Sequence, residues 1–167
     1  YSSGTHPVSI EIAGARIVVN QDGSVQLQVG ATEIGQGSDT VFAQMVAETL
    51  GIRYEMVHVV STQDTDISPF DTGAYASRQT YITGMAVKKA ADEVKRKILD
   101  FAWGMTDIPA QALDIKDANI VYKHSGEVVM PLEEVTMRTY YDTVHAKPIT
   151  SDTSNNARVN AYSFGTT

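Results

Sequence analysis

One stretch of the chain, residues 78–102, constrains the fold more than any other. Its apolar residues recur every three or four positions, the spacing of an amphipathic helix with one buried face. The recurring residues are Ile82, Met85, Ala86, Ala90, Val94, Ile98 and Phe101. Charges of both signs fill most of the other positions and predict a solvated face. A helix of this length needs another layer of secondary structure on which to bury its stripe.

A sheet is the layer that the sequence predicts. Residues 10–19 and 25–29 are β-rich runs on either side of an Asp-Gly turn, which is the signature of a hairpin. In the second run Val25, Leu27 and Val29 alternate with glutamines, so one face of that strand is expected to be buried and the other wet.

The rest of the chain adds shorter elements. Residues 38–50 have helical spacing, with Ser38 or Asp39 able to cap the start and Gly51 to end it, and residues 55–61 read as a strand. Residues 62–77 are predicted to form an irregular loop that leads into the long helix.

The C-terminal third is predicted from weaker patterns. Short strands are expected at 120–122 and 127–129, a helix from Pro131 to about 141, and a polar linker over 146–160. This order of elements predicts an α+β fold in which helices pack on a mixed β-sheet and which begins with a β-hairpin. We treat residues 1–167 as a single domain.

Composition excludes several classes of function. The net charge of −7 argues against a nucleic-acid partner, and no apolar run approaches the ~20 residues of a membrane helix. There is no cysteine, which excludes disulfides and iron–sulfur clusters bound by this chain and fits a cytoplasmic protein. The four histidines are scattered and lack the spacing of a metal site on one helix.

The two ends of the chain predict that it is an internal piece of a longer protein. It begins at Tyr1 without a methionine, and its last residues, 161–167, have the β-branched and aromatic character of a strand that is just beginning.

Two polar, small-residue segments are candidates for chemistry. The first loop, residues 30–38, reads Gly-Ala-Thr-Glu-Ile-Gly-Gln-Gly-Ser and joins a predicted strand to a predicted helix. Gly35 and Gly37 would let the backbone approach a ligand, and Gln36 can donate and accept hydrogen bonds. The amides at the helix start suit an anion. The spacing alone favours a structural turn over an anion site, and it matches neither a Walker loop nor a dinucleotide fingerprint.

The second loop, residues 71–80, reads Asp-Thr-Gly-Ala-Tyr-Ala-Ser-Arg-Gln-Thr and runs into the long helix. Ser77 is a predicted helix cap. The residues alone leave two interpretations open. One is capping beside a surface arginine, and the other is a second helix start that faces the same ligand as the first.

These two segments, in this order, resemble the molybdenum hydroxylase family, which includes the xanthine dehydrogenases and aldehyde oxidases. The run from Asp22 to Ile52 is similar to that family's hairpin, Gly-x-Thr-Glu-Ile/Met-Gly-Gln-Gly loop and helix, and residues 61–87 are similar to its next cofactor loop. The resemblance covers roughly residues 1–100 and is strongest to the large molybdenum subunit of bacterial xanthine dehydrogenases.

The resemblance implies a molybdopterin cofactor, often in its cytosine dinucleotide form in bacteria, whose dithiolene sulfurs hold the metal. It places Gly35, Gln36 and Gly37 against the pterin or its phosphate. It places Ala76, Ser77, Arg78 and Gln79 along the pterin, with Ala76 near the metal. It also implies iron–sulfur clusters and FAD on other subunits or domains, with the rest of the molybdenum subunit as a partner.

The implied reaction is hydroxylation of a heterocycle or aldehyde with oxygen from water, with purines such as hypoxanthine or xanthine as the first choice of substrate. Aldehydes and nicotinate-like heterocycles are the alternative. The family's base glutamate and its Phe-Gly-Gly-Lys-Glu loop are absent from this chain, so no catalytic residue is assigned and Glu33 is expected to fix the first loop by hydrogen bonding. A non-catalytic pterin-binding module and a ligand-free structural domain also stay open.

Overall fold

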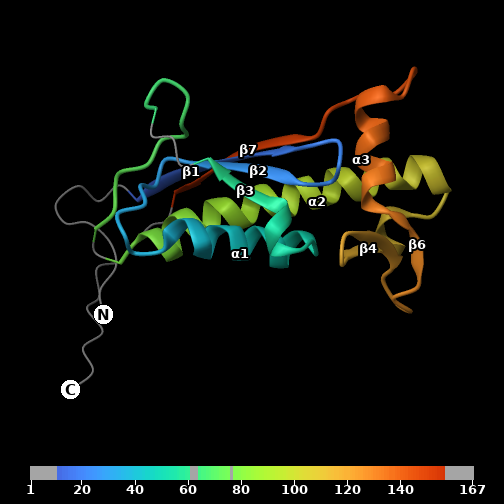
Figure 1. Ribbon diagram of the computed structural model, residues 1–167, viewed down its shortest axis with the longest axis horizontal. Coiled ribbons are helices and arrows are strands. Elements are labelled where there is room, and N and C mark those ends of the chain that lie inside the picture. Colours follow the sequence, from blue (N-terminus) through green and yellow to red (C-terminus); the bar gives the residue numbers. More distant parts are fainter. Residues whose placement is uncertain (1–10, 61–63, 76, 157–167) are drawn as a thin grey trace.

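The computed structural model describes residues 11–60, 64–75 and 77–156, and its larger sheet is the layer that the sequence predicts (Figure 1). The sheet consists of β1 (Ile12–Val19), β2 (Val25–Val29), β3 (Val57–Val60) and β7 (Thr150–Asn156), in the order β3-β2-β1-β7. β1 is antiparallel to β2 and β7, whereas β2 is parallel to β3. The hairpin and the mixed sheet are therefore confirmed.

Two helices cover one face of this sheet, as Figure 1 shows. α1 (Ser38–Leu50) connects the parallel strands β2 and β3, and α2 (Gly84–Thr106) follows a π-helical turn, η2 (Gln79–Thr83). The long helix ends at Thr106, four residues beyond the predicted end at 102, and Asp107 after it has a left-handed φ of +58°. No helix within residues 11–60, 64–75 and 77–156 has the length and apolar character that crossing a bilayer requires.

The core lies between the helices and the larger sheet. The side of α2 that faces the sheet is rich in small residues and includes Ala86, Ala90, Val94 and Ile98, which are fully or almost fully buried. Met85, expected in this stripe, is 39% exposed. The π-helical turn just before it inserts an extra residue per turn, so the buried stripe continues from Ile82 to Ala86 and leaves Met85 outside.

β7 replaces the linker predicted over 146–160, and that prediction is wrong for residues 150–156. The segment reads as a linker because it holds no apolar residue, yet Ser151 and Asn155 are buried. Their side chains are satisfied by α2: Ser151 Oγ donates to Glu93 Oε2 at 2.9 Å, and Asn155 Nδ2 donates to the Ile82 carbonyl at 3.1 Å. A polar strand is stable here because its inward groups have hydrogen-bond partners.

A smaller antiparallel sheet lies at the far end of α2, with α3 beside it (Figure 1). It consists of β4 (Leu113–Lys116), β5 (Asn119–Tyr122) and β6 (Val128–Pro131), and α3 spans Leu132–Tyr141. The predicted strands at 120–122 and 127–129 and the helix after Pro131 are confirmed within one or two residues, whereas β4 was not predicted. The strand expected at 161–167 lies outside the described residues.

Gly51 joins the smaller sheet to α1. Its φ of +79° ends the helix, and a Cβ at this position would lie 2.0 Å from the carbonyl oxygen of Ile115 in β4. The Gly51 carbonyl in turn accepts a hydrogen bond from the Ala118 amide at 3.2 Å. Glycine is therefore required by both the backbone conformation and the close approach of β4.

We expect Gly51→Ala to destabilise the protein by about 3 kcal/mol, since it combines left-handed strain with a backbone clash. Gly104→Ala is the matched control, because Gly104 lies within α2 and a Cβ there would meet nothing within 4 Å. It should stabilise the protein by about 0.5–1 kcal/mol. Urea unfolding measures both, and equal effects of the two substitutions would contradict this account of Gly51.

Candidate functional site

The first loop, residues 30–38, leaves β2 and enters α1 at the end of the molecule opposite the smaller sheet (Figure 1). Gly35 and Gly37 have φ values of +95° and +81°, and a Cβ on either would meet no atom within 4 Å. Backbone conformation, not crowding, therefore accounts for both glycines. The open space beside them allows a ligand to approach the main chain closely, as the sequence predicts.

Glu33 organises this loop. Its carboxylate accepts hydrogen bonds from the amides of Gly35 at 2.7 Å, Gly37 at 3.0 Å and Asp39 at 3.1 Å, and from the Ser38 hydroxyl at 3.2 Å. The hydrogen bonds from Gly37 and Asp39 contribute most to lowering the pKa of Glu33 below its ordinary value. The expectation that Glu33 fixes the loop by hydrogen bonding is confirmed.

The same contacts correct two expectations about the start of α1. Neither Ser38 nor Asp39 caps the helix: the capping position is Gly37, whose amide Glu33 binds. The amides of Gly37 and Asp39 already have a carboxylate partner, so they are not available to an anion. The amides of Gln36 and Ser38 have no acceptor in the part of the chain that the structure describes.

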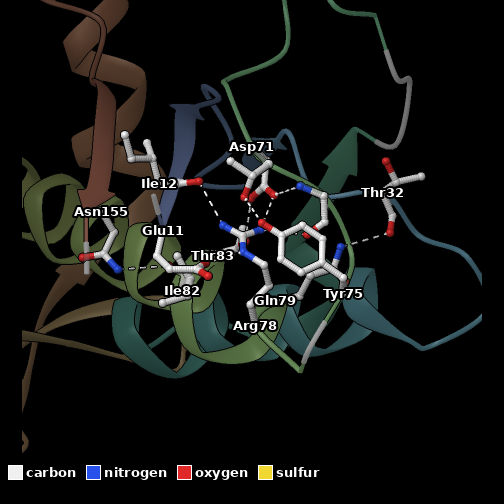
Figure 2. Close-up of polar contacts among 12 residues, drawn as sticks. Glu11, Ile12, Thr32, Asp71, Tyr75, Arg78, Gln79, Ile82, Thr83 and Asn155 are labelled. Atoms are coloured by element: carbon white, nitrogen blue, oxygen red, sulfur yellow. Dashed lines mark hydrogen bonds and ion pairs between the residues drawn. The ribbon is translucent and has the colours of Figure 1, made fainter. Parts of the chain in front are cut away.

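Gln36 links the two loops. Its Oε1 accepts from the Ile34 amide at 2.6 Å, and its Nε2 lies within hydrogen-bond distance of the Thr32 carbonyl at 2.9 Å. Nε2 also donates to Oε1 of Gln79, which comes from the second loop. Gln79 Nε2 in turn donates to the Thr32 carbonyl at 3.3 Å, a contact drawn in Figure 2. Segments 43 residues apart in sequence therefore meet at a pair of carboxamides.

The second loop, residues 71–80, packs directly against the first. A Cβ on Gly30 would lie 2.1 Å from the Pro69 carbonyl oxygen and 2.9 Å from the Asp71 amide, so glycine permits this approach. The predicted cap at Ser77 is wrong: Ser77 is exposed with a left-handed φ of +54°, and no side chain caps the π-helical turn after it. π-Helical turns occur frequently at functional sites. Ala76 lies outside the described residues.

Arg78 is not the surface residue that one interpretation of the sequence supposed. Its side chain is 0% exposed and forms ion pairs with Glu11, at 2.8 Å, and with Asp71. Burial opposes its charge, but these ion pairs outweigh burial and raise the pKa of the guanidinium above its ordinary value. Glu11 carries no sequence signal for this role, because it lies 67 residues from Arg78.

A cavity of about 440 Å³ lies between the two loops. The first loop and α1 contribute Ile34, Gln36, Ser38 and Val41, and the second loop contributes Ala74, Tyr75, Ser77, Arg78, Gln79 and Thr80. The volume is in the range of small-molecule sites. Volume does not single this cavity out, since one of about 840 Å³ lies beside the smaller sheet, but this cavity is lined by residues of both candidate loops.

The predicted residues Gln36, Ser77, Arg78 and Gln79 thus border one cavity, and Gly35 and Gly37, which flank Gln36 in the sequence, are not among its lining residues. Loops on opposite faces would have favoured the ligand-free structural interpretation, but residues of both loops line the same cavity. Among residues 11–60, 64–75 and 77–156, no three His, Asp or Glu side chains are grouped in a way that could hold a metal ion.

A family model described as a molybdopterin cofactor-binding domain matches residues 1–167. The chain is 45% identical, over its whole length, to the xanthine dehydrogenase molybdenum-binding subunit of Escherichia coli O157:H7, of which it covers 22%. It is 27% identical, over 77% of its length, to 16% of the nicotine 6-hydroxylase large subunit of Paenarthrobacter nicotinovorans. The quinoline 2-oxidoreductase of Pseudomonas putida 86 has the same fold, with a TM-score of 0.77 over 87% of this chain and 19% of that one, at 21% identity. The chain thus spans about a fifth of the length of these relatives.

The lowered pKa of Glu33 predicts an acid-sensitive first loop. The carboxylate stabilises the folded chain above pH 4.5, the ordinary value for glutamate, and that contribution is lost as the pH falls through the lower folded value. Glu33→Gln should therefore lower the melting temperature near neutral pH, and its difference from wild type should shrink below pH 4.5. Circular dichroism melts between pH 7 and pH 3 measure this difference.

Glu48→Gln is the control for that experiment. Glu48 is an exposed residue of α1, and no hydrogen bond to its side chain is found in the described chain. Its difference from wild type should be small. A Glu33→Gln difference that stays constant down to pH 3 would contradict the role of the carboxylate.

Proposed function

This chain belongs to the molybdopterin cofactor-binding domain family, and on that premise we propose that its two loops hold the pterin of molybdopterin in the cavity between them. The observation that carries the proposal is the Gln36–Gln79 hydrogen bond, because it brings both candidate loops to the edge of one cavity. The open space beside Gly35 and Gly37 and the two amides without acceptors, those of Gln36 and Ser38, fit an anionic heterocyclic ligand.

The candidate residues differ in what they offer. Gly35 and Gly37 give access to the main chain, and the carboxamides of Gln36 and Gln79 can exchange their mutual hydrogen bond for the donor and acceptor edge of a pterin. Ser77 presents a hydroxyl at the cavity. Arg78 contributes through its backbone, since its guanidinium is bound to other residues of the chain. Ala76 is included because the family resemblance places it near the metal.

When bound, molybdopterin carries the molybdenum redox chemistry, and the protein contributes binding, orientation and electrostatics. We propose that the complete protein is a cytoplasmic, molybdenum-dependent oxidoreductase of the xanthine dehydrogenase type that hydroxylates purines with oxygen from water. Its electrons would leave through iron–sulfur clusters and FAD on other subunits or domains. The base for this reaction is assigned to no residue of this chain.

The 45% identity to a subunit named for xanthine dehydrogenase supports purines as the substrate. The lower identity to a nicotine 6-hydroxylase subunit keeps another heterocycle as the alternative. An aldehyde is the third candidate, and a non-catalytic pterin-binding module is the fourth. All four share the same pterin site, so the site and the substrate need separate experiments.

The site is tested by Gln36→Ala in the full-length protein. The substitution removes a carboxamide that bonds to the first loop and to Gln79, and each such bond contributes on the order of 1 kcal/mol. We expect molybdenum and pterin content to fall about tenfold, measured by mass spectrometry of the metal and by fluorescence of the oxidised pterin. Gln26→Ala is the control, since Gln26 is an exposed glutamine of β2 far from the cavity lining. Full occupancy and turnover in Gln36→Ala would contradict the site.

The substrate is tested by steady-state turnover of the full-length protein with hypoxanthine, xanthine, nicotinate and an aromatic aldehyde. If the complete pocket is built for purine hydrogen bonding, kcat/KM for the better purine should exceed that for the others by at least about 100-fold. Turnover in ¹⁸O-labelled water should place the label in the product. A preference for the aldehyde or for nicotinate would overturn the purine assignment, and loaded protein without turnover on any of them would favour the non-catalytic module.

A further inference from the structure

A cluster of charged side chains is buried beside the cavity, and these side chains take no direct part in the proposed binding. Figure 2 shows Arg78 at its centre, with Asp71 and Glu11 directed toward the guanidinium. The side chains of Arg78 and Asp71 are 0% exposed, and that of Glu11 is 2% exposed. Burying charges costs free energy unless they are paired and hydrogen-bonded, so the arrangement calls for a physical reason.

On one side, the second loop is folded around its own arginine. Arg78 Nη1 donates to the Gly73 carbonyl at 2.8 Å and to the Asp71 carboxylate, and the guanidinium carbon lies 5.4 Å from the centre of the Tyr75 ring. Asp71 continues the network, since it accepts from the Gly73 amide at 2.8 Å and from the Thr83 hydroxyl at 2.7 Å. The guanidinium therefore joins the beginning of the loop to its end.

On the other side, the same guanidinium is bonded to the residues that open β1. Nε donates to Glu11 Oε2 at 2.8 Å, and Nη2 donates to the Ile12 carbonyl at 2.9 Å. A β-bridge between Ala13 and Asp71 and a hydrogen bond of 2.8 Å from the Gly14 amide to the Phe70 carbonyl run alongside. Through Arg78 the second loop is fastened to a strand of the larger sheet.

The cluster lies next to the strained part of the loop. Ser77, which precedes Arg78, has the left-handed φ of +54°, and Gln79, which follows it, contacts Gln36 across the cavity. A left-handed non-glycine residue is strained and persists only where its surroundings hold it. Arg78, the next residue, is bonded to four other residues of the chain through its guanidinium.

We propose that Arg78 is a positioning residue for the cofactor: its buried guanidinium locks Ser77 and Gln79 in the geometry that receives the pterin. The inference rests on the proposed function of the second loop. Arginine is required because its planar fork can reach carboxylates and carbonyls on both sides at once, whereas a lysine ammonium is a single point charge. The side chain acts through the backbone of its neighbours and does not touch the ligand.

The test uses Arg78→Lys in the full-length protein, because it keeps the buried positive charge that Glu11 and Asp71 need. Hydrogen exchange, followed by mass spectrometry, should accelerate about tenfold or more in peptides covering residues 71–83 and stay at wild-type rates in peptides covering 15–29. The rate of cofactor loss from the purified protein should rise by about tenfold or more, since a buried pair has been weakened. A global loss of stability would not confine faster exchange to one segment, and a local role without effect on the ligand would leave the rate of cofactor loss unchanged.

Glu11→Gln is the second variant, for the case in which Arg78→Lys does not fold. It leaves the contacts of the guanidinium with Asp71, Gly73 and Ile12 in place. Hydrogen exchange in residues 71–83 and cofactor loss from the protein should therefore each become faster by only about threefold. Arg16→Lys is the matched control. Arg16 is also on β1 and pairs with Asp152 at 2.8 Å, but it is exposed to 41%, so neither rate should change.

Wild-type rates of exchange and cofactor loss in both Arg78→Lys and Glu11→Gln would overturn the proposal, and so would faster exchange spread evenly over the chain. A wild-type protein that holds no pterin would instead overturn the proposed function. In that case, the exchange comparison would still decide whether Arg78 holds the loop.

Discussion

The packing of α2 across the larger sheet determines where everything else in the molecule lies. Its face of small residues fits closely against β1 and β7, and Gly84 brings its beginning against α1, because a Cβ there would lie 2.9 Å from the sulfur of Met45. Both helices begin at the same end of the molecule, as Figure 1 shows. Two loops that lead into helices starting side by side must meet, and this is why a single cavity forms between segments so distant in sequence.

The start of α1 shows how such a loop can hold its shape before a ligand arrives. A helix N-terminus attracts anions through its unpaired amides and its dipole. Here Glu33 supplies the negative charge from within the loop and binds three backbone amides and a hydroxyl. The helix dipole is thus used to stabilise the loop. In the proposed site, recognition would fall to the exposed main chain and to Gln36, groups that distinguish ligands by their hydrogen-bonding edges and not by charge alone.

Sequence periodicity was sufficient for the parts of the fold in which burial follows a simple pattern. The hairpin, α1 and most of α2 have clear periods of two or of three to four residues, and they are where the sequence places them. β7 escaped prediction because its burial is satisfied by hydrogen bonds to α2 rather than by apolar side chains. Met85 was misplaced because a π-helical turn shifts the phase of the helix, and nothing in the local sequence signals that turn.

At the candidate site too, the sequence predicted some features and not others. Two polar glycine-containing loops before helices indicated where to look, and the structure brings them together. The partners of Arg78 could not be predicted, because an arginine at a loop end reads as solvated unless the distant carboxylate of Glu11 is known to reach it. The role of Glu33 in fixing the first loop was predicted. That Glu33, and not Ser38 or Asp39, binds the amide at the start of α1 could not be predicted, because it depends on the path of the chain in three dimensions.

The two loops are therefore fixed independently and then joined. Glu33 holds the first from within, Arg78 ties the second to β1, and the Gln36–Gln79 contact is the bond between them. A ligand that enters such a cavity does not have to order two flexible segments, so less of its binding free energy is spent on conformational entropy. The contact that a heterocycle would replace is a neutral carboxamide pair, whereas the charged hydrogen bonds that shape the loops remain behind it. With this arrangement, Gln36 and Gln79 could replace their mutual hydrogen bond with hydrogen bonds to a ligand while the charged contacts keep both loops in place.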